Sequence, residues 1–162
     1  DGVVFTYQGD GDLASIGMAE IVHAAARGEK ITVVFINNAV YGMTGGQMAP
    51  TSLPGQATTT SPLGREIHLA GYPIRVAEIL ATLDGAAYIA RQTVDSPKGV
   101  QATKKALQRA FQLQLDNAGF TLVEVLCSCP TWWGKNPKDA LGAIDGWMTG
   151  TYPLGVLKDR AE

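Results

Sequence analysis

Two short clusters of polar residues, roughly 25 positions apart, carry the groups that could bind a metal ion and a phosphate. Gly9-Asp10-Gly11-Asp12 supplies two carboxylates in a glycine-rich turn, and Asn37-Asn38 supplies two side-chain amides. Magnesium prefers oxygen ligands, commonly one or two carboxylates completed by substrate phosphates and water. Asp10 could provide a carboxylate oxygen, Asn38 an amide oxygen, and a backbone carbonyl of the next turn a third ligand. The pattern indicates a diphosphate held through a divalent cation.

Both clusters directly follow segments that have the pattern of buried strands. Residues 3–7 are short, branched and aromatic, and residues 31–36 are almost wholly apolar, as expected for parallel strands covered on both faces. Residues 13–27 carry an apolar stripe at helical spacing, and Gly28 is a natural helix stop. Ligands of open α/β sheets bind at the carboxyl ends of the strands, so residues 9–12 and 37–42 should face one another there. The start of the helix near Leu13 would also favour an anion.

The glycine turn allows two other interpretations. Gly9-x-Gly11-x-x-Ala14 fits the loose dinucleotide-binding pattern, but Asp10 would repel a bare pyrophosphate. The acid expected to bind a ribose is also replaced by Asn37-Asn38. An ordinary turn with an aspartate helix cap is the second alternative, and it leaves the paired asparagines unexplained. The sequence G-x-x-x-x-G-K-[ST] does not occur, which excludes a P-loop.

Composition predicts one domain over residues 1–162. The chain has 46% hydrophobic and 17% charged residues and a net charge of −2, so nothing points to nucleic acid. We interpret Lys104, Lys105 and Arg109 as a solvated helix face. No apolar run approaches the roughly 18 residues of a membrane span, and no signal peptide is visible. Two cysteines spaced C-x-C do not make a disulfide framework, so a cytoplasmic protein is expected.

The rest of the sequence continues the α/β pattern without a repeat or a linker. Residues 48–64 are rich in Thr, Ser, Pro and Gly, and we expect a long surface loop that is either disordered, closes over the substrate or meets a partner subunit. Helices are expected at residues 73–83, 97–117 and 137–147, and strands at residues 86–90 and 120–126. In the first of these helices, Val76, Ile79, Leu80 and Leu83 should share the buried face. The predicted fold is a doubly wound, mainly parallel α/β sheet.

A few single residues have two interpretations each. His23 lies in the middle of the first helix, where packing or surface exposure is favoured over catalysis. His68 follows the long loop and is more open to substrate contact. Trp132-Trp133 could form an interface or pack over the edge of the sheet.

The sequence has G-D-G followed roughly 25 residues later by N-N, and this pattern resembles the signature of thiamine diphosphate enzymes. The stretch from Asn37 to Gln47, which reads NNAVYGMTGGQ, is similar to the β subunit of 2-oxoacid:ferredoxin oxidoreductases of the 2-oxoglutarate or branched 2-oxoacid type. The similarity continues through residues 125–134 and 152–159. The resemblance implies that Mg²⁺ is bound by the side chains of Asp10 and Asn38 and by the carbonyl of Val40. It implies cofactor binding by Gly9, Asp10, Gly11, Asp12, Asn38, Val40, Gly42, Met43 and Thr44.

The resemblance also implies an activity and partners. It implies oxidative decarboxylation of a 2-oxoacid to an acyl-CoA, with coenzyme A as the acyl acceptor and ferredoxin as the electron acceptor. The carboxylate that activates the cofactor is expected on a pyrimidine-binding α subunit, so this chain should be inactive alone. A non-oxidative thiamine diphosphate-dependent decarboxylase or synthase is the alternative, and a nucleotide-binding or interaction domain is a third class. Met43 is either the bulky apolar residue beneath the cofactor or a core residue.

Cys129 matches a cysteine that binds a [4Fe–4S] cluster in the resembled subunits, whose other cysteines lie upstream. Clusters of this kind are normally held by four thiolates, and this sequence has two cysteines. Cys127 has no counterpart in the resembled family, and the alternative is that both cysteines pack as small apolar residues. Because Asp1 directly precedes a buried strand, we expect an upstream part of the subunit to be missing.

Overall fold

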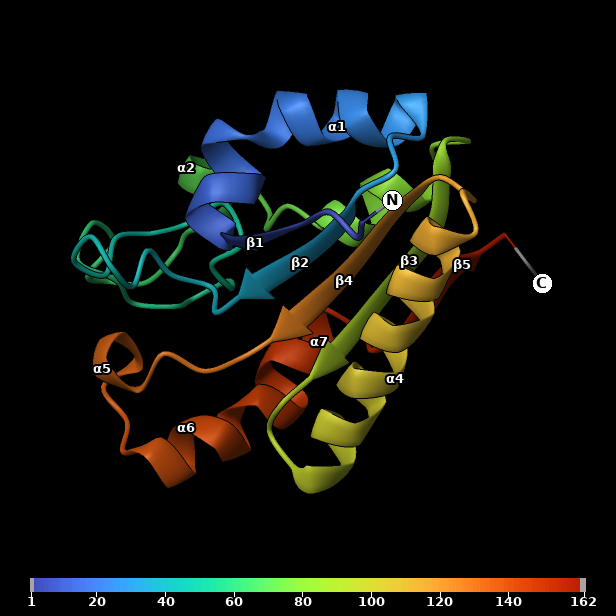
Figure 1. Cartoon of the computed structure of the whole chain (residues 1–162). Helices are drawn as coiled ribbons and strands as arrows, with labels where there is room; N and C mark the ends of the chain where they lie inside the picture. The colour runs from blue at the N-terminus through green and yellow to red at the C-terminus, as the bar shows by residue number, and fades with distance from the viewer. Residues whose placement is uncertain (1, 161–162) are drawn as a thin grey trace.

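Five strands form one sheet with helices on both faces in the computed structural model, which describes residues 2–160 (Figure 1). The strand order is β1-β2-β4-β3-β5. The first four strands of this order run parallel, and β5 runs antiparallel to β3 at the edge. The prediction of a doubly wound, mainly parallel α/β fold is therefore confirmed. The strands are β1 (Phe5–Gly9), β2 (Thr32–Asn37), β3 (Ala86–Thr93), β4 (Phe120–Leu126) and β5 (Gly155–Asp159).

Successive side chains of the central strands point to opposite faces of the sheet, so each strand contributes to two cores. Val33 and Phe35 face α1 (Met18–Arg27) and α3 (Val76–Ala81). Val34, on the opposite face of β2, belongs to the cluster under α4 (Pro97–Leu115). Figure 1 shows α1 above the sheet and α4 on its other side. The remaining helices are η1 (Asp12–Ile16), α2 (Ile67–Ala70), α5 (Pro130–Trp133), α6 (Pro137–Ala143), η2 (Ile144–Met148) and α7 (Thr149–Thr151).

The ends of α1 and α4 follow from their capping residues. The Oγ of Ser96 accepts a hydrogen bond from the N–H of Gly99 (3.1 Å), and Pro97 occupies the first turn of α4. Gly28, with a φ of 67°, ends α1 in the left-handed conformation that glycine adopts without strain. The predicted first helix is divided, because η1 and α1 meet at Gly17. No helix within residues 2–160 combines the length and the apolar character that crossing a bilayer requires.

The structure differs from the predicted elements in three respects. The helix predicted for residues 137–147 is broken, because Asp145 and Gly146 leave the helical conformation within η2. Ile79 was expected on the buried face of its helix, yet it is 40% exposed, and the buried residues of α3 are Val76, Ala77 and Leu80. The antiparallel strand β5 and the short helix α5 have no strong periodic pattern, and neither was predicted.

The prediction of a loop for residues 48–64 is confirmed, and residues such as Pro54, Ala57 and Leu63 are exposed, but part of this loop is buried. Thr51, Ser52, Leu53 and Gln56 are buried, although three of these four side chains are polar. Buried polar groups need hydrogen-bond partners, and here most of them bond to backbone groups. In Figure 1 this loop, coloured teal, lies beyond the arrowhead of β2. It therefore packs against the carboxyl end of the sheet, where the predicted site lies.

Arg65 holds this loop closed from one buried position. Its guanidinium donates six hydrogen bonds to backbone carbonyls of two separate segments, and its side chain is almost inaccessible. Its planar group carries five N–H donors in a fixed geometry, and Nη1 shares its two hydrogens among three of the six acceptors. The acceptors are the carbonyls of Ala49, Pro50, Ser52, Ala70, Gly71 and Tyr72.

Candidate metal and diphosphate site

The turns after β1 and β2 meet at the carboxyl end of the sheet. Gly9 is in register with Ile36, so Asp10 and Asn38 leave neighbouring strands at nearly the same level. The backbone N–H of Val40 donates to Oδ2 of Asp10 and to Oδ1 of Asn38, at 3.2 Å in each case. A carboxylate oxygen and an amide oxygen thus converge on one N–H group. The structure therefore brings together the three residues that the sequence proposed as metal ligands.

Asp10 is a buried carboxylate whose hydrogen-bond partners are all neutral. Its side chain is 3% exposed; Oδ2 accepts from the hydroxyl of Thr51 (2.7 Å), and Oδ1 accepts from the N–H of Gly11 (2.9 Å). Burial raises the pKa of Asp10 from 3.8 to about 6, although the hydrogen bonds from Thr51, Gly11 and Val40 oppose the rise. Within residues 2–160, no Lys or Arg side chain forms an ion pair with it. A carboxylate in this environment is stabilised by a cation.

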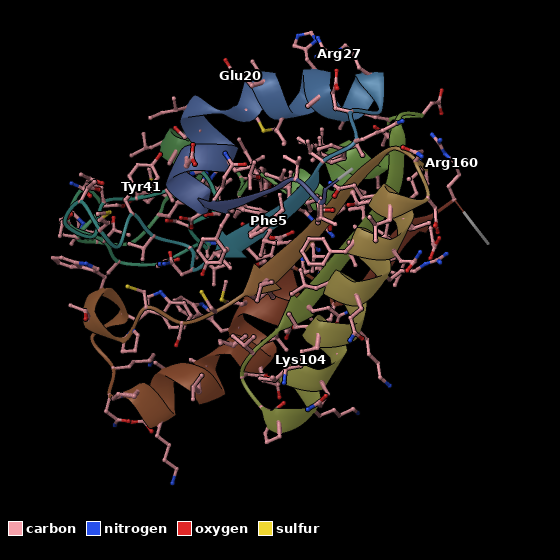
Figure 2. The ribbon with its side chains drawn as sticks, viewed as in Figure 1. Phe5, Glu20, Arg27, Tyr41, Lys104 and Arg160 are labelled. Carbon is pink, nitrogen blue, oxygen red and sulfur yellow. The ribbon has the colours of Figure 1, made fainter. Side chains whose placement is uncertain are left out.

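A cavity of about 720 Å³ opens beside these turns. This volume lies within the usual range for small-molecule and cofactor sites. Asp10 and Val40 do not line it, but residues adjacent to them do. Met43 is fully exposed at the cavity, so it is not a core residue. Figure 2 shows Tyr41 at this end of the molecule and Arg160 at the opposite end. The lining residues are Gly9, Gly11, Asp12, Ser15, Ile16, Asn38, Tyr41, Gly42, Met43 and Thr44.

The donor set and the shape of the turn fit a magnesium diphosphate. Carboxylate, amide and carbonyl oxygens are the hard ligands that Mg²⁺ selects. The carbonyl of Val40 accepts one hydrogen bond, from the N–H of Gly42 (2.9 Å), which leaves a second lone pair. Glycine at position 11 allows the ring of Tyr41 to pack closely against the turn, since a Cβ there would lie 2.7 Å from that ring. Within residues 2–160, no cluster of three or more His, Cys, Asp or Glu side chains forms a separate metal site.

Two tryptophans hold the second turn through their indole N–H groups. The Nε1 of Trp132 donates to the carbonyl of Gly42 (2.6 Å), and that of Trp133 donates to the carbonyl of Asn38 (3.1 Å). The ring of Trp132 also covers Gly46, where any Cβ would overlap it. Both tryptophans lie on α5, far from the turn in sequence. The pair was noted in the sequence as an interface or packing feature, and its role at the turn was missed.

The two cysteines lie beside the same turn. Both are half-buried and free, and the Sγ of Cys129 would be 3.2 Å from a Cβ on Gly42. Burial raises the pKa of Cys127 to about 12, with further electrostatic contributions from the neighbouring Asp10 and Cys129. Cys127 therefore remains a neutral thiol at ordinary pH.

A buried ionic network supports the first asparagine of the pair. Asn37 donates from Nδ2 to Oε1 of Glu124 (2.7 Å), and Oε2 of Glu124 accepts from Nε of Arg91 (2.8 Å). Arg91 also pairs with Glu78. Burial lowers the pKa of the Arg91 guanidinium, but Glu78 and Glu124 outweigh this effect and raise it above its ordinary value. Burial also raises the pKa of Glu124, although Arg91 and Asn37 oppose the rise. The hydrogen bonds of this network fix Asn37 at the end of β2.

Sequence reasoning located one half of the site and missed the other. The glycine turn and the paired asparagines were identified from their residue types. Thr51, which donates to Asp10, was missed because nothing in the composition of its loop indicates a buried hydroxyl. His23 and His68 are exposed, and neither lines the cavity.

Comparison with known proteins agrees with this geometry. Residues 1–125 match the family described as thiamine pyrophosphate enzyme, C-terminal TPP binding domain. The chain is 45% identical over 161 residues to ketoisovalerate oxidoreductase subunit VorA of Methanothermobacter thermautotrophicus, covering 99% of this chain and 34% of that protein. It is 40% identical over 174 residues to 2-oxoglutarate synthase subunit KorB of Methanocaldococcus jannaschii, covering 99% of this chain and 55% of that protein.

A solved structure shares the fold. The structure of 2-oxoglutarate:ferredoxin oxidoreductase from Magnetococcus marinus, with 2-oxoglutarate, coenzyme A and succinyl-CoA bound, superposes with a TM-score of 0.69. The two sequences are 27% identical, and the match covers 93% of this chain and 54% of that one. The chain thus spans about a third to about half of the length of these relatives.

Proposed function

The chain belongs to the thiamine pyrophosphate enzymes through their C-terminal TPP-binding domain, and on this basis we propose that it binds thiamine diphosphate and Mg²⁺ in a 2-oxoacid:ferredoxin oxidoreductase. The observation that carries the proposal is the convergence of Asp10 and Asn38 on the N–H of Val40. Relatives named ketoisovalerate oxidoreductase and 2-oxoglutarate synthase support the class of reaction.

The residues of this chain would bind and orient the diphosphate end of the cofactor. Asp10 and Asn38 would supply side-chain oxygens to Mg²⁺, and Val40 its carbonyl. Backbone N–H groups at the start of η1 would face the phosphates, where the helix end favours negative charge. Gly9, Gly11, Asp12, Gly42, Met43 and Thr44 would complete the cofactor-binding surface.

The overall reaction would convert a 2-oxoacid and coenzyme A to an acyl-CoA and CO2, with two electrons passing to ferredoxin. When bound, thiamine diphosphate supplies the nucleophile and the electron sink for breaking the bond between the keto carbon and the carboxylate. The related structure contains 2-oxoglutarate, coenzyme A and succinyl-CoA, which is consistent with this reaction. The relative named ketoisovalerate oxidoreductase and the related ferredoxin oxidoreductase structure favour the oxidative reaction over the alternative of a non-oxidative decarboxylase or synthase.

The partners follow from what the chain would need. We propose a pyrimidine-binding α subunit that contributes the activating carboxylate, so the isolated chain should not decarboxylate 2-oxoacids. Cys129 would join cysteines outside this sequence in a [4Fe–4S] cluster, and its position against Gly42 supports a cluster near the cofactor turn. The cytoplasmic location stays a prediction.

Calorimetric titration with thiamine diphosphate tests the proposal. The chain should bind the cofactor in the presence of Mg²⁺ and lose binding when EDTA removes the metal. Asp10→Ala and Asn38→Ala should each weaken magnesium-dependent binding at least about tenfold, because an octahedral ion tolerates lost ligands poorly.

Asp116→Ala is the matched control. Asp116 is an exposed carboxylate after α4 that bonds to Gln112, and its loss should leave the titration unchanged. Unchanged cofactor binding by folded Asp10→Ala would refute the assignment of the metal site.

A further inference from the structure

Ala39 separates the two proposed ligands Asn38 and Val40, and its backbone is unusual. Its φ of 60° places it in the left-handed region, and its side chain is fully buried. There the Cβ of an L-residue crowds the following carbonyl, so a residue other than glycine stays only where its surroundings hold it. The shape of the ligand-bearing turn therefore depends on the contacts of Ala39.

Three side chains hold the backbone of Ala39. Its N–H donates to Oδ1 of Asn37 (3.1 Å). Its carbonyl accepts from the Oγ of Ser52 (2.6 Å) and from the Nε2 of Gln56 (2.8 Å). Both lone pairs of this carbonyl are thus occupied by donors from one loop.

The two donors are themselves fixed. The Oγ of Ser52 accepts from the N–H of Ala49 (2.9 Å), and Oε1 of Gln56 accepts from the N–H of Leu53 (2.8 Å). Both side chains are buried, so water does not compete for these bonds. Ser52 and Gln56 therefore present their donors to Ala39 in one defined direction.

The carbonyl of Ala39 and the N–H of Val40 belong to the same peptide group. Because that group is planar, fixing the carbonyl also fixes the direction of the N–H. This is the N–H that bonds to both Asp10 and Asn38. The contacts on one end of the peptide thus determine where the two proposed ligand oxygens meet at the other end.

We propose that Ser52 and Gln56 are positioning residues for the cation site, acting through the Ala39–Val40 peptide. They keep Ala39 left-handed and so hold the oxygens of Asp10 and Asn38 together. This inference rests on the proposed function for its ligand. It gives the loop of residues 48–64 a role in the site that does not require it to close over a substrate.

The expected effect follows from the fraction of chains with the correct turn. We call the two hydrogen bonds from Ser52 and Gln56 to the carbonyl of Ala39 the clamp. Without the clamp, Ala39 disfavours the left-handed region, and the apparent affinity for the cofactor falls with the fraction of molecules that keep this conformation. One neutral hydrogen bond contributes enough for Ser52→Ala or Gln56→Met to weaken magnesium-dependent thiamine diphosphate binding about fivefold. Both variants are measured well below their unfolding temperatures. There, a substitution that only lowers the stability of the fold would leave the cofactor affinity unchanged.

Ala39→Gly separates positioning from folding. Glycine adopts the left-handed region without strain, so the turn depends less on the clamp. Added to Ser52→Ala, Ala39→Gly should restore at least about half of the lost binding free energy. Ser61→Ala is the matched control, because Ser61 lies in the same loop and donates its hydroxyl to a backbone carbonyl, that of Gly64 (2.6 Å).

The full chain is titrated with thiamine diphosphate and Mg²⁺, and the hydrogen exchange of the Val40 amide is followed without ligand. The inference requires weaker binding and faster Val40 exchange in Ser52→Ala and Gln56→Met, recovery with Ala39→Gly, and little change in Ser61→Ala. It is overturned if folded Ser52→Ala and Gln56→Met both bind within about twofold of the parent chain, or if Ser61→Ala loses as much.

The exchange measurement keeps this inference separate from the proposed function. If the parent chain binds no thiamine diphosphate, the proposed function fails, and the Val40 amide still reports on the clamp. Faster exchange in Ser52→Ala than in Ser61→Ala would then support the clamp, and equal exchange would overturn it.

Discussion

Replacing Asp10 by asparagine should stabilise the cofactor-free chain near neutral pH. Each factor of ten in proton affinity corresponds to about 1.36 kcal/mol, so the rise of the Asp10 pKa from 3.8 to about 6 means that the charged carboxylate costs the fold about 3 kcal/mol. Asparagine is neutral and nearly the same size. It keeps one acceptor for Thr51 and Val40 but loses the bond from Gly11, at about 1 kcal/mol. The expected net gain is about 1 to 2 kcal/mol.

The pH dependence follows from the direction of the pKa shift. The folded protein binds the Asp10 proton more tightly than the unfolded chain does, because the folded-state pKa is the higher one. The cost is absent below about pH 3.8, where both states are protonated, and complete above about pH 6. As the pH rises through this window, the native chain should lose stability relative to Asp10→Asn.

Urea denaturation at about pH 7 and about pH 4, without Mg²⁺ or cofactor, measures the difference directly. Asp12→Asn changes an exposed neighbouring carboxylate and should alter the free energy of unfolding by less than about 0.5 kcal/mol. Asp10→Asn should be more stable than the parent chain only at the higher pH. If it is equally stable or less stable there, the charged carboxylate of Asp10 does not destabilise the fold, and the electrostatic reasoning is wrong.

Three further predictions concern the surroundings of the site. Trp132→Phe removes the indole N–H that bonds to the carbonyl of Gly42 but keeps a ring over Gly46. Cofactor affinity should therefore fall about fivefold in calorimetry, while the free energy of unfolding in urea should change by less than about 1 kcal/mol. Arg65→Lys should cost about 3 kcal/mol or more in urea denaturation, because three ammonium donors cannot satisfy six carbonyls; a loss below about 1 kcal/mol would contradict this. In the anaerobically purified complex, Cys129→Ser should lower iron content and abolish ferredoxin reduction while cofactor binding survives, whereas iron content and reduction equal to the parent complex would leave Cys129 as a packing residue.

Strands β1 to β4 and the long helix α4 were predictable because their signals are local. The apolar run of residues 120–126 became β4 without a change of bounds, and the cap at Ser96 fixed the start of α4. The edge strand β5 was missed, since its burial depends on pairing with β3, which lies far away in sequence. Sequence periodicity shows which face of an element is apolar and does not show which distant segment covers it.

The site was predictable as far as its chemistry comes from one βαβ unit. Asp10 and Asn38 have the residue types and the strand-end positions that a magnesium diphosphate needs. Thr51, Ser52 and Gln56 could not be identified, because they become functional candidates only through backbone contacts made by folding. Their polar character predicted exposure, whereas hydrogen bonding to the turn allows their burial.

The position of the metal in the complex tests the central claim most directly. Crystals of the chain, with any subunits that co-purify, would be grown with thiamine diphosphate and Mn²⁺, and the manganese located by its anomalous scattering. We expect one manganese ion bound by the side chains of Asp10 and Asn38, the carbonyl of Val40 and the cofactor diphosphate. A manganese ion that binds the diphosphate without contact to Asp10 and Asn38 would contradict this expectation.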